Sequence, residues 1–401
     1  MSSSEADSPS TSPGPSSAPF EVVIAGGGVA ALEAALALRD LAGERVALTM
    51  IAPEPEFVYR PMAIREPFAY GAAQRYPLAE IARDVGAALV EDSFAWVDTE
   101  ARVSHTETGR QIPYDALLLA LGARAHPRYE HALTIDDRRL DEIMHGLIQD
   151  VEDGYVKSLA LVIPARMAWP LPIYELALMI AARAQDMQVE LALTIVTPEE
   201  RPLGIFGLRA TEALSELLSE AKITTITSAQ AEIPRSGHVT ISPGDRQLEV
   251  DRIIALPELF GPAVRGLHVS THGFIPVDLH SKVRTAERVY AAGDATDFAV
   301  KQGGIACLQA DAAAQAIAAL AGADVEPLPF KPVIRGMLLT GGAPKFLSAR
   351  ITGGQGFDSE IADTPSWSPA AKIAAVYLAP YLDELDRAAG GSRAALGDQA
   401  G

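Results

Sequence analysis

Cysteine is nearly absent from this sequence, and the single Cys307 among 401 residues restricts the available chemistry. One thiol excludes an internal disulfide, a redox-active cysteine pair, and a zinc or iron–sulfur site built on several cysteines. Cys307 stands among apolar residues in a stretch typical of a helix. We therefore expect a small buried side chain and not a reactive thiol, because apolar surroundings disfavour the thiolate.

Long apolar runs and excess positive charge are also missing. No run of 18 apolar residues occurs, so no transmembrane helix is expected. The 33 lysines and arginines against 52 aspartates and glutamates give a formal net charge of −19, which argues against nucleic acid and anionic lipid as partners. Residues 1–19 are rich in serine and proline and lack the basic start and apolar core of a signal peptide, which favours a disordered tail and a cytoplasmic protein.

What the chain does have is a glycine-rich turn near its start. The apolar run 21–25 ends at Gly26-Gly27-Gly28, and an alanine-rich segment follows over 29–41. This is the strand–turn–helix pattern of a dinucleotide-binding fold, in the form G-x-G-x-x-A. Taken alone, such a turn can also be a simple chain reversal.

Each small residue of this turn has a physical reason in a nucleotide site. Gly26 permits the tight turn, and Gly28 lets the backbone approach a pyrophosphate. Ala31 keeps the helix close to the strand, with Ala30 beside it in the first helical turn. The free N–H groups and the positive dipole end at the start of the helix favour phosphate binding there.

Two further strand-to-glycine segments support the nucleotide interpretation. Residues 114–123 form a buried-strand pattern that closes on Gly122, and residues 283–295 lead into Gly293 and Asp294. Three such pieces in this order resemble the flavoproteins with two dinucleotide-binding domains. The resemblance implies an FAD cofactor, with the first piece at the pyrophosphate, the second close to the cofactor, and Asp294 bound to the ribitol or the pyrophosphate.

The alternation of strands and helices predicts an α/β fold of two Rossmann-like domains, the second inserted in the first. We expect an FAD-binding domain over 20–125 and 248–322, an inserted NAD(P)-binding-like domain over 126–247, and a C-terminal region over 323–401. The elements predicted in the inserted domain are helices at 140–151, 171–184 and 208–220 and strands at 158–163, 189–196 and 222–227. The segment 250–256 is expected to return the chain to the first domain.

The second strand of the first domain, 45–51, does not end in the usual ribose-binding acid. Ala52 and Pro53 occupy that end, and Glu54 comes next, either as a displaced ribose ligand or as a solvent-facing acid. In the related flavoproteins an aromatic-x-aromatic-x-Pro stretch at this place lies along the cofactor. Here that stretch ends in Arg60 and Pro61, and Arg60 is either a partner for an anion of FAD or an unbound loop arginine.

The inserted domain lacks the glycines of a nicotinamide site. No glycine occurs between Lys157 and Gly204, and three prolines with Trp169 fill the turn after the 158–163 strand, which blocks close approach by a pyrophosphate. The Trp-Pro-x-Pro-x-Tyr-Glu opening, which ends in Tyr174 and Glu175, resembles sulfide:quinone oxidoreductases and the flavoprotein subunit of flavocytochrome c sulfide dehydrogenase. Trp169 with Tyr174 could line a pocket for a flat apolar acceptor such as a quinone, or plug an abandoned site.

The segment Lys301-Gln302-Gly303-Gly304 precedes a helix expected over 305–320. It resembles the segment of type II NADH dehydrogenases and sulfide:quinone oxidoreductases that meets the isoalloxazine ring. A helix start at the ring edge would stabilise negative charge on reduction, and Lys301 would add positive charge there. The alternative is a plain helix cap with a solvated lysine. Candidate catalytic residues are thus Lys301, Gln302 and Trp169, and no metal site is expected.

The C-terminal region has apolar residues near helical spacing, from Trp367 to Leu382, interrupted by Pro380. They predict packing over the flavin domain, a homodimer contact, or at most peripheral membrane contact at the inner face of the membrane. Interfacial helices carry Lys and Arg on the polar face, whereas this stretch has mainly acids.

These features predict an FAD-dependent oxidoreductase that passes two electrons from an unidentified small-molecule donor through flavin to a quinone or a soluble acceptor. Sulfide oxidation is not expected, because in the resembling families it proceeds through cysteines beside the flavin. The alternatives are an NAD(P)H:quinone oxidoreductase similar to type II NADH dehydrogenases, and a non-catalytic protein that binds flavin or senses redox state.

Overall fold

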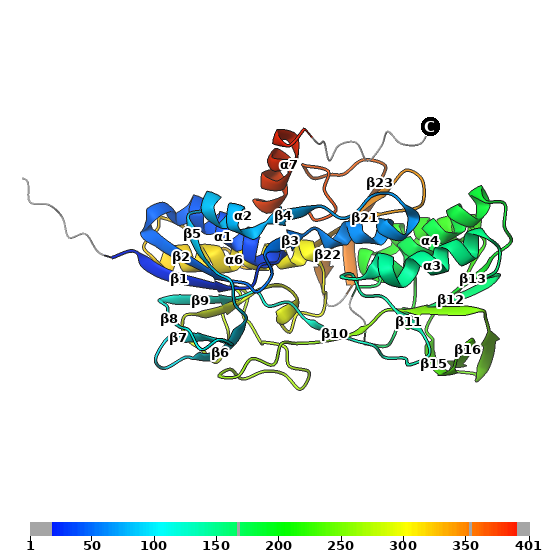
Figure 1. The fold of residues 1–401 in the computed structure, drawn as a ribbon, viewed down its shortest axis with the longest axis horizontal. Coiled ribbons are helices and arrows are strands. Elements are labelled where there is room, and N and C mark those ends of the chain that lie inside the picture. The colour runs from blue at the N-terminus through cyan, green and yellow to red at the C-terminus, as the bar shows by residue number, and fades with distance from the viewer. Residues whose placement is uncertain (1–17, 167–168, 353–354, 391–401) are drawn as a thin grey trace, which may run out of the picture.

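Two α/β lobes lie side by side in the computed structural model, which describes residues 18–166, 169–352 and 355–390 (Figure 1). The first lobe contains a five-stranded parallel sheet in the order β20-β9-β1-β2-β5. The second lobe contains another, in the order β11-β18-β12-β13-β14. Strand order that reverses beside the first strand is typical of doubly wound nucleotide-binding sheets, so the predicted fold class is confirmed.

The elements of the first lobe's sheet and its helices are β1 (Phe20–Ala25), α1 (Val29–Ala42), β2 (Val46–Ile51), α2 (Leu78–Asp84), β5 (Ala87–Val90), β9 (Ala116–Leu119), β20 (Val289–Ala291) and α6 (Gly303–Leu320). Those of the second lobe are β11 (Leu133–Thr134), α3 (Leu140–Glu152), β12 (Ser158–Val162), α4 (Leu171–Asp186), β13 (Ala192–Val196), α5 (Leu208–Glu220), β14 (Ile223–Ile226) and β18 (Arg252–Ala255). Most of the predicted helices and strands end within a few residues of the sequence-based ranges, but the strand expected in 283–295 is shorter, and α2, β5 and β11 were not predicted.

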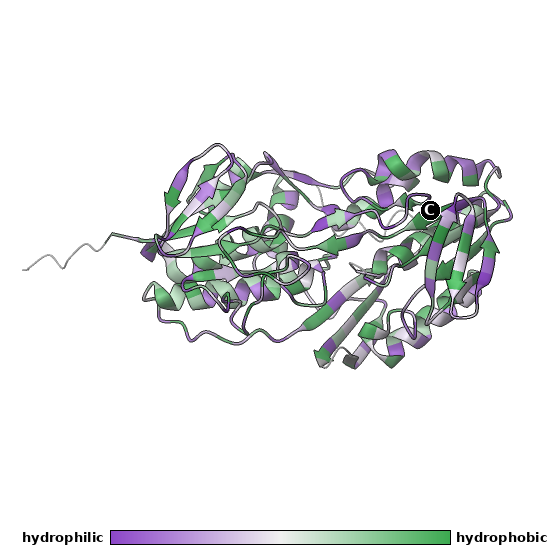
Figure 2. Cartoon of the chain, turned by 90° about the horizontal axis from the view of Figure 1, so that it is seen from below, coloured by the Kyte–Doolittle hydropathy of each residue, from purple (hydrophilic) through white to green (hydrophobic). Residues whose placement is uncertain are grey.

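The first lobe is held together by small residues. Strands β1 and β9 are buried on both faces and read as continuous apolar runs, as expected for a parallel sheet covered by helices. Helices α1 and α6 both consist largely of alanine on their buried sides, which lets the two helices pack closely above the sheet. Figure 2 shows the apolar residues concentrated along the sheets and helices of both lobes.

Small antiparallel sheets surround the two parallel ones, and the sequence analysis did not predict them. They comprise the pair β3 (Glu56–Val58) with β4 (Arg75–Pro77), the sheet β6 (Phe94–Asp98), β7 (Val103–Thr106) and β8 (Gln111–Pro113), and the sheet β15 (Gln230–Arg235), β16 (His238–Ser242) and β17 (Arg246–Glu249). Short 3-10 helices cover 43–45, Arg60–Phe68, 204–206 and 293–295.

The chain crosses between the lobes on two adjacent strands. β10 (Arg124–His126) leads into the second lobe, and β19 (Glu258–Phe260) leads back, paired antiparallel to β10. The boundary drawn at residue 248 is too early, because β18 pairs with β11 and β12 inside the second sheet. The physical reason is that an apolar strand of this length fits either parallel sheet equally well.

The C-terminal region ties the lobes together. The antiparallel sheet β21 (Val333–Leu338), β22 (Lys345–Thr352) and β23 (Gln355–Ala362) packs against α5 of the second lobe, and helix α7 (Leu378–Ala388) packs on α1 of the first (Figure 1). Leu378 and Leu382 are buried there, so of the alternatives considered the structure contains packing over the first domain. The helical pattern from residue 367 was too long, since the helix begins only at Leu378.

Among the described residues, α6 is long and apolar enough to cross a membrane by length and composition alone. Two thirds of it, 67%, is buried inside the fold, as is typical of a core helix.

Candidate functional site

The three glycines after β1 differ in what surrounds them. A Cβ on Gly26, whose φ is +129°, would lie 2.3 Å from the carbonyl oxygen of Ala120. A Cβ on Gly27 would lie 2.7 Å from Leu78 Cδ1, whereas a Cβ on Gly28 would meet no heavy atom within 4 Å. The protein itself therefore needs the first two glycines, while the third borders open space at the N-cap of α1. This geometry fits a pyrophosphate held by Gly28 and the start of α1.

The ends of β9 and β20 meet beside this turn. Gly293 has a φ of +75°, and a Cβ on it would lie 3.3 Å from Ala30 Cβ and 3.2 Å from Ala306 Cβ. The small residues Gly293 and Ala30 thus let the end of β20 approach α1 and α6 closely. Ala31, the next residue of α1, is fully buried. Gly122 has a φ of +70° with open space around a Cβ, as expected of a turn along a ligand groove.

Asp294 follows Gly293 at the same edge of the sheet. Its carboxyl is half-buried, and burial raises its pKa to about 6, partly offset by the positive charge of Lys301. Asp137, which precedes α3, raises this pKa further, so it lies close to Asp294. Hydroxyl groups of a bound ligand would be natural partners for such a carboxylate.

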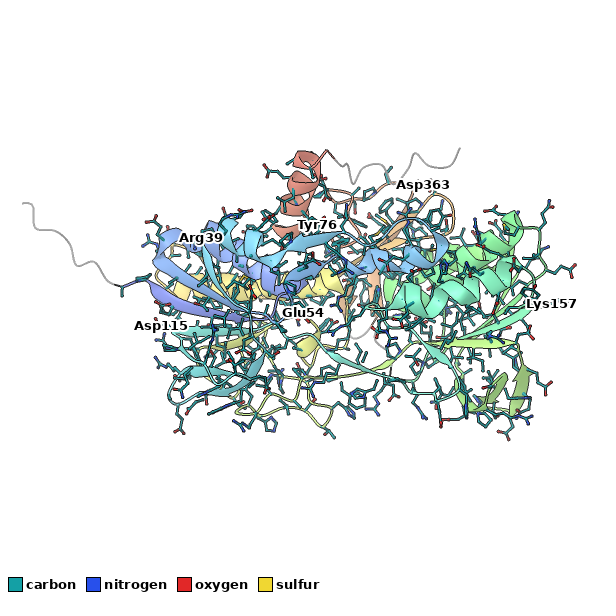
Figure 3. The ribbon with its side chains drawn as sticks, in the orientation of Figure 1. Arg39, Glu54, Tyr76, Asp115, Lys157 and Asp363 are labelled. Carbon is teal, nitrogen blue, oxygen red and sulfur yellow. The ribbon has the colours of Figure 1, made fainter. Side chains whose placement is uncertain are left out.

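Glu54 and Arg60 both follow β2 in the chain but have different surroundings. Glu54 is exposed and lies toward the middle of the molecule, whereas Arg39 and Asp115 lie toward the outer end of the first lobe (Figure 3). Arg60 begins the 3-10 helix together with Pro61, and its Nη1 lies 3.4 Å from Asp137 Oδ1. The structure therefore pairs Arg60 with a carboxylate of the second lobe, in the segment between β11 and α3.

Lys301 is buried at the flavin-side segment. Its ammonium donates to the carbonyl oxygen of Thr296 and lies 4.1 Å from the ring centre of Phe274. Burial lowers its pKa to about 8, although Asp294 and Asp297 raise it. A solvated lysine is excluded, because the side chain is only 8% exposed.

The next residues, Gln302 to Gly304, are engaged by the protein itself. The Gln302 Oε1 caps α6 by accepting from Ile305 N at 3.0 Å, and its Nε2 donates to Arg335 O at 2.8 Å. A Cβ on Gly303 would lie 2.9 Å from Ile373, and a Cβ on Gly304 would lie 3.5 Å from Ala374 O. The space at Gly303, expected to face the ring, is filled by the C-terminal segment. The catalytic role given to Gln302 stays a prediction.

A buried ion pair lies next to this contact, and sequence reasoning missed it. Lys372 Nζ donates to both Glu175 carboxylate oxygens at 2.8 Å, and Leu339 N donates to Oε1 at 3.0 Å. Burial raises the pKa of Glu175 and lowers that of Lys372, and their mutual attraction opposes both shifts. The pair joins Glu175, in the second turn of α4, to the C-terminal segment, where the N–H of the next residue, Ile373, donates to the Tyr59 hydroxyl at 2.8 Å. The pairing could not be predicted from one sequence, because nothing in it links an acid in a helix to a lysine about 200 residues later.

Side chains occupy the carboxyl-terminal edge of the second sheet, where a nicotinamide cofactor would need free backbone N–H groups. Tyr174, fully buried, donates to Glu199 Oε2 at 2.6 Å, and burial raises the pKa of Glu199 to about 7. Tyr174 is therefore inside the domain and does not line a pocket beside Trp169. Trp169 instead packs edge-to-face on Phe206, with ring centres 5.6 Å apart, and nothing places it beside Lys301. Its catalytic role remains a prediction.

Two remaining expectations concern reactive and metal-binding groups. Cys307 is 1% exposed, and burial raises its thiol pKa well above the ordinary value. Within the part of the chain that the structure describes, no group of three or more His, Cys, Asp or Glu residues is arranged to hold a metal ion.

Comparison with known proteins agrees with this geometry. Residues 20–147 match the family model described as pyridine nucleotide-disulphide oxidoreductase. No curated protein matches the sequence.

Several solved structures share the fold. The sulfide:quinone oxidoreductase from the hyperthermophilic bacterium Aquifex aeolicus superposes with a TM-score of 0.77 at 18% identity, over 86% of this chain and 87% of that chain. The ferredoxin reductase for the CYP199A2 system from Rhodopseudomonas palustris gives 0.64 at 20% identity, over 83% of each chain. The NAD-dependent persulfide reductase from A. fulgidus gives 0.60 at 18% identity, over 84% of this chain and 65% of that chain. Residues 20–147 thus match the pyridine nucleotide-disulphide oxidoreductase model, and the chain shares with these solved structures a fold of two dinucleotide-binding domains.

Proposed function

We propose that this protein transfers two electrons from a donor through FAD to a quinone. The observation that carries the proposal is the buried Glu175–Lys372 pair, which lies beside the start of α6. Reducing a quinone to a quinol takes two protons as well as two electrons. A buried acid and a buried amine in direct contact can hold and pass protons where bulk water is excluded.

FAD would be held by the first lobe. Gly28 and the start of α1 would bind the pyrophosphate, and Asp294 would accept from hydroxyl groups, with Glu54 and Arg60 as further candidates along the groove. The bound cofactor would supply two-electron chemistry. Lys301, held over Phe274 and beside Asp294, would place positive charge at the flavin end.

The C-terminal segment would form one wall of the acceptor site. Ile373 lies against Gly303, and the preceding Lys372 reaches Glu175 in the second turn of α4. At Lys372 Nζ one proton can move to Glu175 Oε1 or onward to an acceptor oxygen, because burial brings the two pKa values toward each other. The similar fold of a sulfide:quinone oxidoreductase supports a quinone as acceptor, while the single buried Cys307 argues against sulfide as donor.

The test uses Glu175→Gln and Lys372→Met, with Lys345→Met as matched control. Lys345 forms an exposed pair with Asp363 in the C-terminal sheet, so its loss removes a lysine without touching the buried pair. The FAD of each protein is photoreduced without oxygen, and reoxidation by a water-soluble ubiquinone analogue is followed by flavin absorbance.

We expect reoxidation of the Glu175 and Lys372 variants to be about 10²-fold slower, the scale of one proton-transfer group. Their FAD content should stay unchanged. Wild-type protein whose reduced flavin does not react with the quinone would overturn the proposal, as would equal rates in all four proteins.

A further inference from the structure

The two strands that connect the lobes form a cationic surface on an acidic protein. Segments 124–131 and 258–272 contain three arginines and four of the eight histidines of the chain, with two acids, although the whole chain has a net charge of −19. Arg166, from the turn after β12, adds a fourth guanidinium. β10 runs along the lower side of the molecule in Figure 1, the side that Figure 2 views.

We define the linker face as Arg124, His126, Arg128, Arg166, Phe260 and His272. Arg124 pairs with Phe260 and His126 with Glu258 across β10 and β19, so these side chains share one face of the ribbon. The guanidinium of Arg166 lies 5.4 Å from the ring centre of Phe260, and its Nη1 is 2.8 Å from His272 Nδ1. His126 and His272 meet the same ring edge-on, with ring centres 5.1 and 6.0 Å away.

Positive charge on this face is only partly compensated. Glu258 has a side chain that is 15% exposed, and it serves two arginines, with Arg128 at 3.7 Å and Arg166 at 4.0 Å. Glu232 pairs with Arg128 at 2.8 Å on its outer side. Arg124 and Arg166 therefore remain exposed around an aromatic ring, and arginine with aromatic residues is the composition of energetically important protein interfaces.

The face also borders the flavin end of the first lobe. His272 is two residues before Phe274, whose ring lies under the Lys301 ammonium at 4.1 Å. Arg166 stands in the turn after β12, beyond the carboxyl end of that strand. The face is built from β10, β19 and the 261–274 loop, whereas the Glu175–Lys372 pair is built from α4 and the C-terminal segment.

We propose that the linker face is the docking surface for an acidic one-electron carrier protein, which acts as the electron donor. The rest of the chain repels an acidic partner, so such a partner can approach only where the local charge is positive, and this orients it beside the flavin. Two reduced carriers then give one electron each, and one quinone takes both electrons with two protons from solvent and becomes a quinol. This inference rests on the proposed quinone reduction for the fate of the electrons.

The test compares the double variant Arg124→Glu/Arg166→Glu with the control Arg209→Glu/Arg350→Glu. The control makes the same charge change at exposed arginines of α5 and the C-terminal sheet. The probe is an acidic plant-type [2Fe–2S] ferredoxin, reduced with one equivalent of dithionite and freed of excess reductant. Binding to the FAD-loaded protein is measured by calorimetry between 20 and 200 mM salt, and flavin reduction by stopped flow.

Wild type and control should bind and be reduced, with affinity that falls as salt increases. The linker-face variant should bind at least tenfold more weakly at low salt, with unchanged FAD content and melting temperature. No binding by wild type, or equal binding by both variants, overturns the docking surface. The docking surface is also overturned if Arg166 binds the phosphate of NADPH instead. That outcome would be seen as a loss of NADPH affinity in the Arg166→Glu variant.

The result is separable from the proposed function. Photoreduced protein that reduces quinone but does not bind ferredoxin contradicts the docking surface alone. Protein that accepts electrons from ferredoxin but leaves quinone oxidised contradicts the quinone proposal alone.

Discussion

The two parallel sheets of this molecule have similar strand order, but their carboxyl-terminal edges are built differently. In the first lobe the turn after β1 leaves open space at Gly28, at the uncovered start of α1. In the second lobe the turn after β12 contains prolines, and Tyr174 from the first turn of α4 donates to Glu199 beyond β13. The edge of the first lobe is open, because Gly28 has no side chain, and we call it the open edge. The edge of the second lobe is occupied by side chains that hydrogen-bond to one another, and we call it the filled edge.

The difference shows how a nucleotide-binding fold can keep its architecture and change its chemistry. A dinucleotide needs bare backbone N–H groups at a helix start and a free acid after the next strand. In the second lobe the acid at that place, Glu199, already accepts from Tyr174 and from Thr197 Oγ1 at 3.0 Å. The start of α4 serves the C-terminal segment through Glu175 and Lys372 instead.

The largest effect is expected from a side chain placed at Gly28, in the open edge of the first lobe. Gly28→Val should abolish FAD binding and leave the fold intact, because its side chain enters space that no protein atom occupies. Gly26→Ala is the matched contrast, since its Cβ would collide with Ala120 O and the φ is unfavourable for alanine, so it should destabilise the protein itself. FAD content by absorbance and melting by circular dichroism separate the two. A Gly28→Val protein that stays yellow would contradict the assignment.

The second expectation concerns the filled edge. NADH and NADPH should reduce the flavin poorly or not at all, because the second lobe offers them neither a glycine turn nor a free acid. Anaerobic stopped-flow absorbance with millimolar nucleotide measures this directly. Fast bleaching by micromolar NADH would remove the distinction between the two edges and restore an NADH dehydrogenase interpretation.

Sequence reasoning worked best where the signal is local. The Gly26–Gly28 turn, the helix after it and the strand leading to Asp294 are contiguous patterns, and the structure places them at one edge of one sheet. It failed where partners are far apart in the chain. The Glu175–Lys372 pair and the filling of Gly303 by Ile373 depend on where the C-terminal segment crosses, which no local pattern specifies. The assignment of β18 to the wrong sheet has the same origin, since strand pairing is a long-range choice.

A smaller effect is expected at Asp294. Asp294→Ala should weaken FAD binding without unfolding the protein, because it removes a charge-assisted acceptor at the open edge. Losing such a bond costs roughly 1.5–3 kcal/mol, or about 10- to 150-fold in Kd. Fluorescence titration of the apoprotein with FAD measures the change, and Asp294→Asn tests how much of it depends on charge. Unchanged affinity in both variants would remove Asp294 from the site.

The smallest effect should come from beneath the open edge, where two carboxyl groups meet between α1 and α6. Glu33 is fully buried and accepts from the backbone N–H groups of Val376 and Tyr377 at 2.8 and 3.0 Å, which holds the start of α7. Asp311 is 9% exposed, and burial together with the neighbouring Glu33 raises its pKa to about 8. Asp311 thus holds a proton at neutral pH that an unfolded chain, with an aspartate pKa near 4, releases.

This difference fixes the sign of a pH effect. Between about pH 4 and pH 8 the Asp311 carboxyl holds a proton in the folded state that it has lost in the unfolded state, so the contribution of this group to stability should fall as pH rises, by at most about 1.4 kcal/mol per pH unit. Asp311→Asn keeps the size of the side chain and cannot ionise, so its unfolding free energy should change less with pH and exceed that of wild type near pH 8. Urea unfolding at pH 5, 6.5 and 8 measures the slope for both proteins. Glu33→Gln is the contrast, because it weakens the acceptor for the start of α7 and should destabilise the protein at every pH. Parallel slopes for wild type and Asp311→Asn would mean that Asp311 is ionised in the folded protein, and that the open edge of the first lobe has a second buried charge beneath it.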